Sequence, residues 1–209
     1  MALDLEEQEQ IAELKAWWRQ HGTRILAVLA ALALAFGGWQ FWRGHEQRQA
    51  AEAGALYDTL VQAAQAGEAK ALREAAGALA ENYPRTLYAS MGGLVSARHY
   101  FDRDDLKSAK AQLQWVLERS PSQDFRDLAR LRLAAVLLDE KAYDEALKLL
   151  DTSPAPAYEA QYAALRGDVR VAQDQADAAR AAYRLALEKA GNDSAFRESV
   201  RMRLDALGG

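Results

Sequence analysis

The chain has 209 residues, of which 50% are hydrophobic and 27% are charged, so it can bury a core and is expected to form one domain or two. Alanine occupies 45 positions and Val, Ile and Thr together only 14, which favours helix and argues against a β-sandwich, a barrel or a large parallel sheet. The absence of cysteine excludes disulfides, thiolate metal sites and cysteine nucleophiles, and a net charge of −4 argues against nucleic acid as the main partner.

Residues 1–24 form a tail in front of an apolar stretch. The apolar residues of the tail recur at loosely helical spacing, which suits a short amphipathic helix on a membrane surface. These residues are Leu3, Leu5, Ile11, Leu14 and Trp18. A frayed, solvated tail fits the same residues, so both alternatives stay open.

Residues 25–42 are uncharged and are bracketed by Arg24 and Arg43. In a helix, these residues rise roughly 27 Å, close to the thickness of the hydrocarbon core of a bilayer. Tryptophan prefers the headgroup level of a membrane, and four of the five in the chain cluster here, two upstream of this stretch and two at its C-terminal edge. They are Trp17, Trp18, Trp39 and Trp42. We therefore predict a single transmembrane helix over residues 25–42, in contact with membrane lipid.

Two other interpretations fit part of this pattern. A cleaved signal peptide would use Ala33-Leu34-Ala35 as its cleavage site, but the preceding tail is long and carries several acidic residues, unlike a short basic n-region. A helix buried in a protein core would also be apolar.

The basic residues beside the predicted span give it a direction. Three precede it and two follow it closely: Lys15, Arg19 and Arg24, then Arg43 and Arg48. This slight excess favours a cytoplasmic N-terminus and an external C-terminal part.

From Glu46 onward, apolar-periodic stretches alternate with short breaks. This spacing predicts helices of about 10–20 residues joined by tight turns. Ser, Asp or Asn at a break is well placed to cap the following helix. The breaks are Gln65-Ala66-Gly67, Asn82-Tyr83-Pro84, Asp102-Arg103-Asp104, Ser120-Pro121-Ser122, Glu140-Lys141-Ala142, Ser153-Pro154-Ala155-Pro156, Gln173-Asp174-Gln175 and Gly191-Asn192-Asp193.

Two of the predicted helices carry clear apolar stripes, each expected to pack against a neighbouring helix. The stripes are Leu106, Ala109, Leu113, Val116 and Leu117, and then Leu128, Leu131, Ala135 and Leu138. Charged residues are expected on the opposite, solvated sides. They are Lys107, Lys110 and Glu118 on the first helix, and Arg126, Asp127, Arg130 and Arg132 on the second.

Three stretches align as a repeat at the second helix of each hairpin. An alanine recurs at nearly regular spacing, with a small residue twelve positions before it and a large apolar residue four positions after it. The three sets are Ala97, Ala109 and Leu113; Ala134, Ala146 and Leu150; and Gly167, Ala179 and Tyr183. Small residues let the two helices of a hairpin approach closely, and the larger one is expected to fill the gap to the next hairpin. This is the pattern of a tetratricopeptide repeat (TPR), a helix–turn–helix of about 34 residues.

An ordinary helical bundle with chance small residues is the alternative to the repeat. Within the repeat, Ala186 also stands at consensus spacing, and Pro121 closes a unit where the consensus has proline. Residues 46–84 are too degenerate to align.

Two short runs are more specific than the repeat: Arg-Leu-Arg-Leu-Ala at 130–134 and Arg-Gly-Asp-Val at 166–169. With further stretches at 83–89, 106–120, 127–151, 165–173 and 178–187, the chain resembles the bacterial inner-membrane family YfgM, the ancillary subunit of the SecYEG translocon, essentially from end to end. The resemblance implies a cytoplasmic tail, one span and a periplasmic TPR-like domain. It also implies a role beside the SecYEG translocon and with periplasmic chaperones that receive exported proteins, and it brings no catalytic residues.

Few residues suggest chemistry. No two of His21, His45 and His99 share metal-ligand spacing, and no known catalytic or phosphate-binding motif occurs. We expect His21 and His45 to be interfacial, and His99 to be solvated or hydrogen-bonded.

Other candidates have structural explanations. We expect close packing at Gly92-Gly93, helix capping and dipole roles for Asp104 and Asp105, and a helix-interior place for Arg166-Gly167-Asp168. Arg126, Arg130 and Arg132 suit an acidic partner, but Asp124 and Asp127 are interleaved with them and favour a solvated mixed face.

These observations predict an all-α protein, with a single N-terminal transmembrane helix followed by a TPR-like α-solenoid of helical hairpins. Residues 1–24 form a cytoplasmic tail, residues 25–42 a transmembrane helix and residues 43–209 a periplasmic TPR-like domain, in a bacterial inner membrane.

Together with the predicted span and the repeat, the resemblance implies the function of an ancillary scaffold at the Sec translocon that binds exported proteins, periplasmic chaperones or both. We expect no catalysis, cofactor, metal or nucleic acid. A general envelope-assembly scaffold and a stress-regulatory adaptor are the alternatives. The helical register is too approximate to assign the binding residues.

Overall fold

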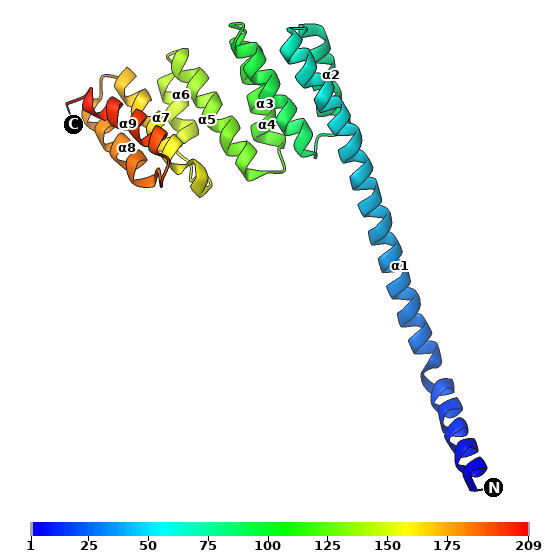
Figure 1. Ribbon diagram of the computed structural model, residues 1–209. Coiled ribbons are helices and arrows are strands. Elements are labelled where there is room, and N and C mark those ends of the chain that lie inside the picture. Colours follow the sequence, from blue (N-terminus) through cyan, green and yellow to red (C-terminus); the bar gives the residue numbers. More distant parts are fainter. Residues whose placement is uncertain (1, 209) are drawn as a thin grey trace. The chain divides into compact units, whose positions relative to one another are not determined.

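The computed structural model describes the backbone of residues 2–208 and the side chains of residues 15, 17–22, 24, 26, 27 and 30–208. All regular structure in this part of the chain is helical, as predicted (Figure 1). The elements are α1 (Ala2–Ala66), α2 (Ala69–Asn82), α3 (Leu87–Phe101), α4 (Leu106–Arg119), α5 (Gln123–Asp139), α6 (Tyr143–Leu150), the 3-10 turn η1 (Pro156–Tyr158), α7 (Glu159–Ala172), α8 (Ala176–Lys189) and α9 (Ser194–Asp205). The chain divides into two compact units, Met1–Gln49 and Ala50–Gly209.

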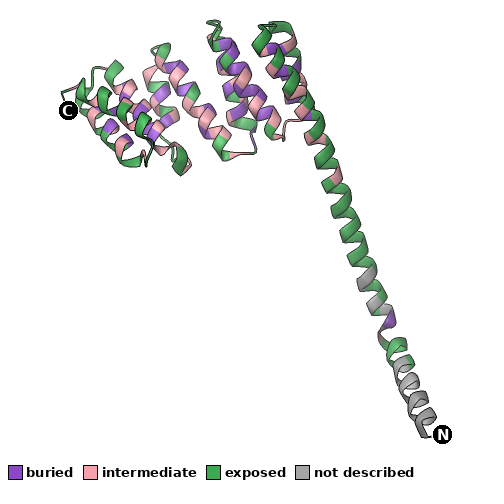
Figure 2. Ribbon diagram, viewed as in Figure 1, coloured by how far each residue is buried: buried purple, intermediate pink, exposed green. Residues whose placement is uncertain are grey.

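The first unit belongs to α1. Its tail is helical from Ala2 onward and continues without a break into the rest of α1, while the placement of an amphipathic helix on a membrane surface stays a prediction. Large apolar side chains are exposed along this unit (Figure 2), with Leu34 78% and Phe41 81% accessible.

Within the described residues, no helix combines the length and the apolar character that crossing a membrane requires. The predicted span at 25–42 includes Ile25, Val28 and Leu29, whose side chains lie outside the described residues, and it stays a prediction.

The second unit is a row of helical hairpins. All eight breaks expected from the sequence coincide with the ends of helices. The side chains of Asp105 and Asp193 accept hydrogen bonds from the backbone N–H groups of Ser108 and Phe196, so capping is confirmed at these two breaks. Ser122 occupies the cap position of α5 without making a side-chain bond there, and its expected capping role was therefore wrong.

Four turns inside hairpins share one geometry. In each, a single residue in the left-handed region precedes the second helix: Gly67 (φ 75°), Asp104 (φ 61°), Lys141 (φ 61°) and Asp174 (φ 59°). The next N–H reaches back five residues to a carbonyl of the first helix, over 2.8–3.0 Å in all four turns. This is the Schellman arrangement that satisfies the last carbonyls of a helix. The repeated turn confirms the repeat, and Asp104 is a left-handed turn residue placed before the cap residue Asp105.

The nine residues that defined the predicted repeat are all buried. Gly167 shows how the pattern works, because a Cβ there would come under 3.0 Å from the ring of Tyr183. The large residue thus fills space inside its own hairpin as well as lying in a cluster with Val200 of α9, and the assignment to the next hairpin alone was incomplete.

The first hairpin escaped alignment for a structural reason. In each later hairpin the anchor alanine stands four residues after the cap position, and the equivalent residue of α2 is Leu72. The small position twelve residues earlier holds Leu60, and both leucines are buried. The space for Leu60 comes from Gly92 of the next hairpin, where a Cβ would lie 3.2 Å from Leu60 Cδ1 and 2.8 Å from Leu79 Cδ1.

The predicted stripe of α4 is confirmed, but that of α5 was shifted. The buried residues of α5 are Asp127, Ala129, Leu133, Ala134, Val136 and Leu137, whereas the four predicted stripe residues are only partly buried. Asp127 is the clearest correction, because it was expected in solvent and is 0% exposed. Its carboxylate is buried because it accepts bonds from Gln123, Arg130 and the backbone N–H of Ala155.

Hairpins stack on their neighbours along the chain. From α2 to α9 the helices of this unit pack in sequence, and α5 also packs against both α3 and α7. Buried residues gather where these helices meet (Figure 2). Such stacking is typical of repeat proteins and leaves the first helices of successive hairpins side by side along one face.

Candidate functional site

Two glycines bring α3 close to its neighbours. Gly92 lies against the leucines of α1 and α2, and a Cβ at Gly93 would lie 2.5 Å from Cγ2 of Val116 in α4. The predicted close-packing role of Gly92-Gly93 is therefore confirmed. This packing fixes one side of α3 and leaves another side free to line a surface.

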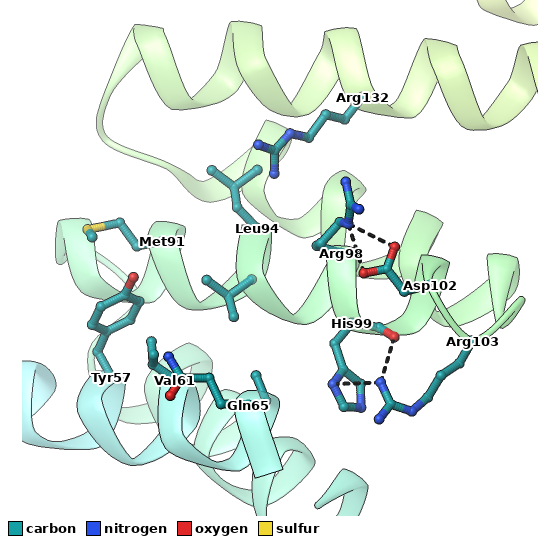
Figure 3. A pocket seen from close by; sticks show the side chains of 12 residues that line it. Tyr57, Val61, Gln65, Met91, Leu94, Arg98, His99, Asp102, Arg103 and Arg132 are labelled. Atoms are coloured by element: carbon teal, nitrogen blue, oxygen red, sulfur yellow. Dashed lines mark hydrogen bonds and ion pairs between the residues drawn. The ribbon is translucent and has the colours of Figure 1, made fainter. Parts of the chain in front are cut away.

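A groove of about 560 Å³ opens on that free side, within the second unit. Its walls come from the first helices of three successive hairpins: α1, α3 and α5 (Figure 3). The apolar lining includes Tyr57, Val61, Met91, Leu94 and Val95. A smaller cavity of about 220 Å³ lies between α3, α4 and α5, and Ala97, Phe101 and Val136 contribute to it.

Arg98 and Arg132 line both cavities. The two side chains extend from α3 and α5 toward the same space (Figure 3). Nε of Arg98 donates to the Asp102 carboxylate at 2.8 Å. Burial lowers the pKa of Arg132, and the positive charge of Arg98 lowers it further. The space between α3 and α5 is thus a positive part of the groove, next to its apolar lining.

His99 lies at the floor of the groove and is only 5% exposed, so of its two predicted states the hydrogen-bonded one is observed. Its Nδ1 lies 3.0 Å from Nη1 of Arg103, and because arginine only donates, Nδ1 accepts this bond. Among the described residues, Nε2 has no hydrogen-bond partner. Burial, followed by the charge of Arg103, lowers the pKa of His99, while the backbone of Ala64 and the carboxylate of Asp102 offset part of the effect.

The three arginines considered together in the sequence serve different purposes. Arg126 donates to the carbonyl of Ser120, and Arg130 pairs with the buried Asp127 at 2.7 Å. Only Arg132 points into the groove. The predicted shared, solvated face was therefore wrong, because Asp127 draws Arg130 into an internal network.

Arg166-Gly167-Asp168 lies inside α7, as predicted. Asp168 accepts bonds from the hydroxyl of Tyr183 at 2.8 Å and from Arg203 of α9, so this run joins three helices. His21 stacks on Trp17, and its Nδ1 lies 3.2 Å from the carbonyl oxygen of that residue.

Sequence reasoning did not identify the residues that line the groove. A signal for them exists in the repeat register once the small position of each first helix, which is Leu60 in α1, Ala97 in α3 and Ala134 in α5, is used as the origin. Tyr57 and Leu94 stand three residues before it, Val95 and Arg132 two before it, and Val61 and Arg98 one after it. Equivalent positions in successive repeats therefore form the groove.

Comparison with known proteins shows which family and which relatives the chain is similar to. The chain matches the tetratricopeptide repeat-like domain family over residues 15–209. It is 33% identical to the "Ancillary SecYEG translocon subunit" of Neisseria gonorrhoeae over 208 residues, covering 99% of this chain and 100% of that protein. Proteins with the same description in Haemophilus influenzae and Escherichia coli are 29% and 30% identical, with 99% and 96% of this chain and 100% and 96% of those proteins covered.

No solved structure is significantly similar to the chain. The whole-length relatives carry the name of a translocon subunit and not of an enzyme. The hairpin repeat, the match across residues 15–209 and these relatives agree on one family. The chain belongs to the YfgM family of ancillary SecYEG translocon subunits, with a TPR-like domain.

Proposed function

We propose that the protein is an ancillary subunit of the Sec translocon and acts there as a scaffold that binds exported proteins, periplasmic chaperones or both. The observation that carries the proposal is the end-to-end similarity to relatives named as ancillary SecYEG translocon subunits. A groove lined by successive first helices supports it, because stacked hairpins offer extended surfaces to peptides. The scaffold works without catalysis or a cofactor.

The proposal includes one membrane span over residues 25–42, a cytoplasmic tail at 1–24 and a periplasmic domain at 43–209. Exposed apolar side chains support the span, since Leu32, Leu34 and Phe36 are each at least 60% accessible and lipid would remove them from water. Anchoring beside a partner raises the effective concentration to roughly millimolar, so weak contacts in the groove suffice.

Topology is tested with single cysteines, for which the chain is well suited because it has none of its own. Gln20→Cys and Gln114→Cys variants of the full chain are treated in intact cells with a maleimide that crosses the outer but not the inner membrane. We expect labelling at position 114 alone, with position 20 labelled after lysis. Labelling of position 20 in intact cells, with position 114 protected, would reverse the topology.

Partners are tested by photocrosslinking in intact cells. Photoreactive residues replace Leu34 in the predicted span, Met91 in the groove and Glu118, an exposed residue of α4 that serves as the control. We expect translocon subunits to crosslink from position 34 and exported proteins or chaperones from position 91, with neither from position 118. Crosslinks from position 34 to a different membrane complex would favour the alternative function, that of a general envelope-assembly scaffold, over a role at the translocon. Identical products from positions 91 and 118 would remove the groove as the binding face.

A further inference from the structure

The residues that line the groove carry more positive charge than negative charge. Arg98 and Arg132 approach one space from two helices, and Arg98 has Asp102 as its partner. Within the described part of the chain, Arg132 takes part in no ion pair. Two guanidinium groups with a single exposed carboxylate, which pairs with Arg98, leave a positive charge beside an apolar wall.

The apolar wall adjoins this charge. Tyr57, Met91 and Leu94 line the larger cavity, and Phe101 lines the smaller one on the other side of the arginines. A ligand that fills the groove therefore meets aromatic and aliphatic surface on both sides of a positive centre. An apolar side chain and a carboxylate on one ligand satisfy both features.

The geometry of the walls favours an extended peptide. Packed helices lie about 8–10 Å apart, and an extended chain advances about 3.3 Å per residue. About six residues therefore reach from α1 across α3 to α5. A segment of this length presents alternate side chains to the groove, as extended peptides do in other recognition surfaces.

We propose that the groove binds an extended peptide segment in which one Asp or Glu carboxylate pairs with Arg98 and Arg132 while a large apolar side chain nearby lies against Tyr57, Met91 and Leu94. The proposal rests on the proposed scaffold function and assigns a ligand class to it. Arginine suits this task because its planar group binds a carboxylate through two parallel hydrogen bonds. The apolar wall supplies affinity, and the arginines select for the acidic residue.

The test uses the full chain in mild detergent and fluorescein-labelled eight-residue peptides, with affinity measured by fluorescence polarisation. One set carries Phe and Asp at separations of one to four residues in a Gly/Ser background. A second set has Asn in place of Asp, and a third has Ser in place of Phe. We expect the best Asp peptide to bind about tenfold more tightly than its Asn partner, as loss of one charged hydrogen-bonded pair implies.

Variants assign that preference to residues. We expect Arg132→Gln to weaken the Asp peptide about tenfold and to leave the Asn peptide unchanged. Arg132→Lys retains part of the preference, since it keeps the charge without the planar group. Arg184→Gln is the matched control, because Arg184 is an exposed arginine of α8 outside the groove. Circular dichroism melts show that each variant is folded.

Equal affinity for the Asp and Asn peptides, unaffected by Arg132→Gln, would overturn the inference. Binding of none of the peptides would overturn it as well. In both cases the crosslinks from positions 34 and 91 report independently on the scaffold at the translocon. Failure of the peptide test is thereby distinguished from failure of the proposed function.

Discussion

The ring of Tyr183 occupies the place where a side chain at Gly167 would be. A Cβ on Gly167 would lie under 3.0 Å from three atoms of that ring, so α7 and α8 approach more closely than any other residue at 167 allows. We expect Gly167→Ala to lower the free energy of unfolding by about 1–3 kcal/mol through overpacking, despite the helix-favouring effect of alanine. Urea unfolding of the full chain, followed by circular dichroism, measures the change.

Gly77 of α2 is the matched control for this substitution. It is also a glycine inside a helix, but nothing lies within 4 Å of a Cβ built on it. Gly77→Ala is expected to raise the free energy of unfolding by about 0.5–1 kcal/mol, because only the backbone entropy changes. Changes of opposite sign in the free energy of unfolding of the two variants would follow from packing at Gly167. Changes of the same sign would rule out packing as the cause.

Lys141 adopts a left-handed conformation with φ 61°, at the position where the first hairpin has Gly67. A side chain in this region costs about 1–2 kcal/mol, whereas glycine adopts it freely. We therefore expect Lys141→Gly to raise the free energy of unfolding by about 1 kcal/mol. In the same urea titration, Gly67→Ala should lower it by a similar amount, and a Lys141→Gly variant of reduced stability would contradict the explanation.

Asp127 connects α5 to the segment before α7. Its Oδ2 accepts the backbone N–H of Ala155 at 2.9 Å, while Oδ1 accepts from Gln123 and Arg130. Asn at this position cannot accept at both atoms and leaves the charge of Arg130 unpaired. We expect Asp127→Asn to destabilise the protein by about 3 kcal/mol, as is common for a buried pair that loses one partner. The same urea titration measures this loss.

Asp177 provides the control for Asp127. It also pairs with an arginine three residues along its helix, Arg180, but its side chain is 97% exposed. An exposed pair contributes little, so Asp177→Asn should leave the free energy of unfolding unchanged. A comparable loss in both variants would show that burial of the Asp127 network is not what matters.

The sequence predicted the helices, the eight breaks and the repeat because all three depend on local or strictly periodic features. Glycine, proline and polar clusters stop helices wherever they occur, and Ala109, Ala146 and Ala179 recur at the right spacing. The first hairpin was out of reach because Leu60 and Leu72 occupy its small positions, and the compensating Gly92 belongs to another repeat.

The burial of Asp127 and the direction of the groove arginines could not be predicted from the sequence, for a related reason. The N–H of Ala155, which donates to the Asp127 carboxylate, and the hydroxyl of Tyr162, which donates to the Asp127 backbone carbonyl, lie far along the chain. A charged residue on a helix otherwise favours solvent. Arg132 was grouped with Arg126 and Arg130 by proximity in the chain. Their directions differ by the helical rotation between them, which only a correct register of α5 resolves.

The lowered pKa of His99 predicts that the stability of the protein depends on pH. The pKa of His99 is lowered from 6.5 by burial and by Arg103, so the unfolded chain binds more protons than the folded chain between the lowered pKa and 6.5. The stability that depends on the neutral imidazole is therefore complete above pH 6.5 and is lost as the pH falls through that window. Asp105 does not contribute there, because its pKa is lowered from 3.8 by hydrogen bonds to Ser108. The raised pKa values of Tyr158, Tyr162 and Tyr183 place their titration above 10.

We expect the free energy of unfolding of the full chain to be smaller at pH 5.0 than at pH 7.5, and His99→Gln to reduce that difference. Glutamine does not titrate, and its carbonyl oxygen can still accept from Arg103. His45→Gln is the control, because His45 is an exposed histidine of α1 outside the second unit. Urea titrations at the two pH values give the comparison. An unchanged difference in His99→Gln would mean that protonation elsewhere in the chain sets the response, since the buried imidazole would then be removed without effect.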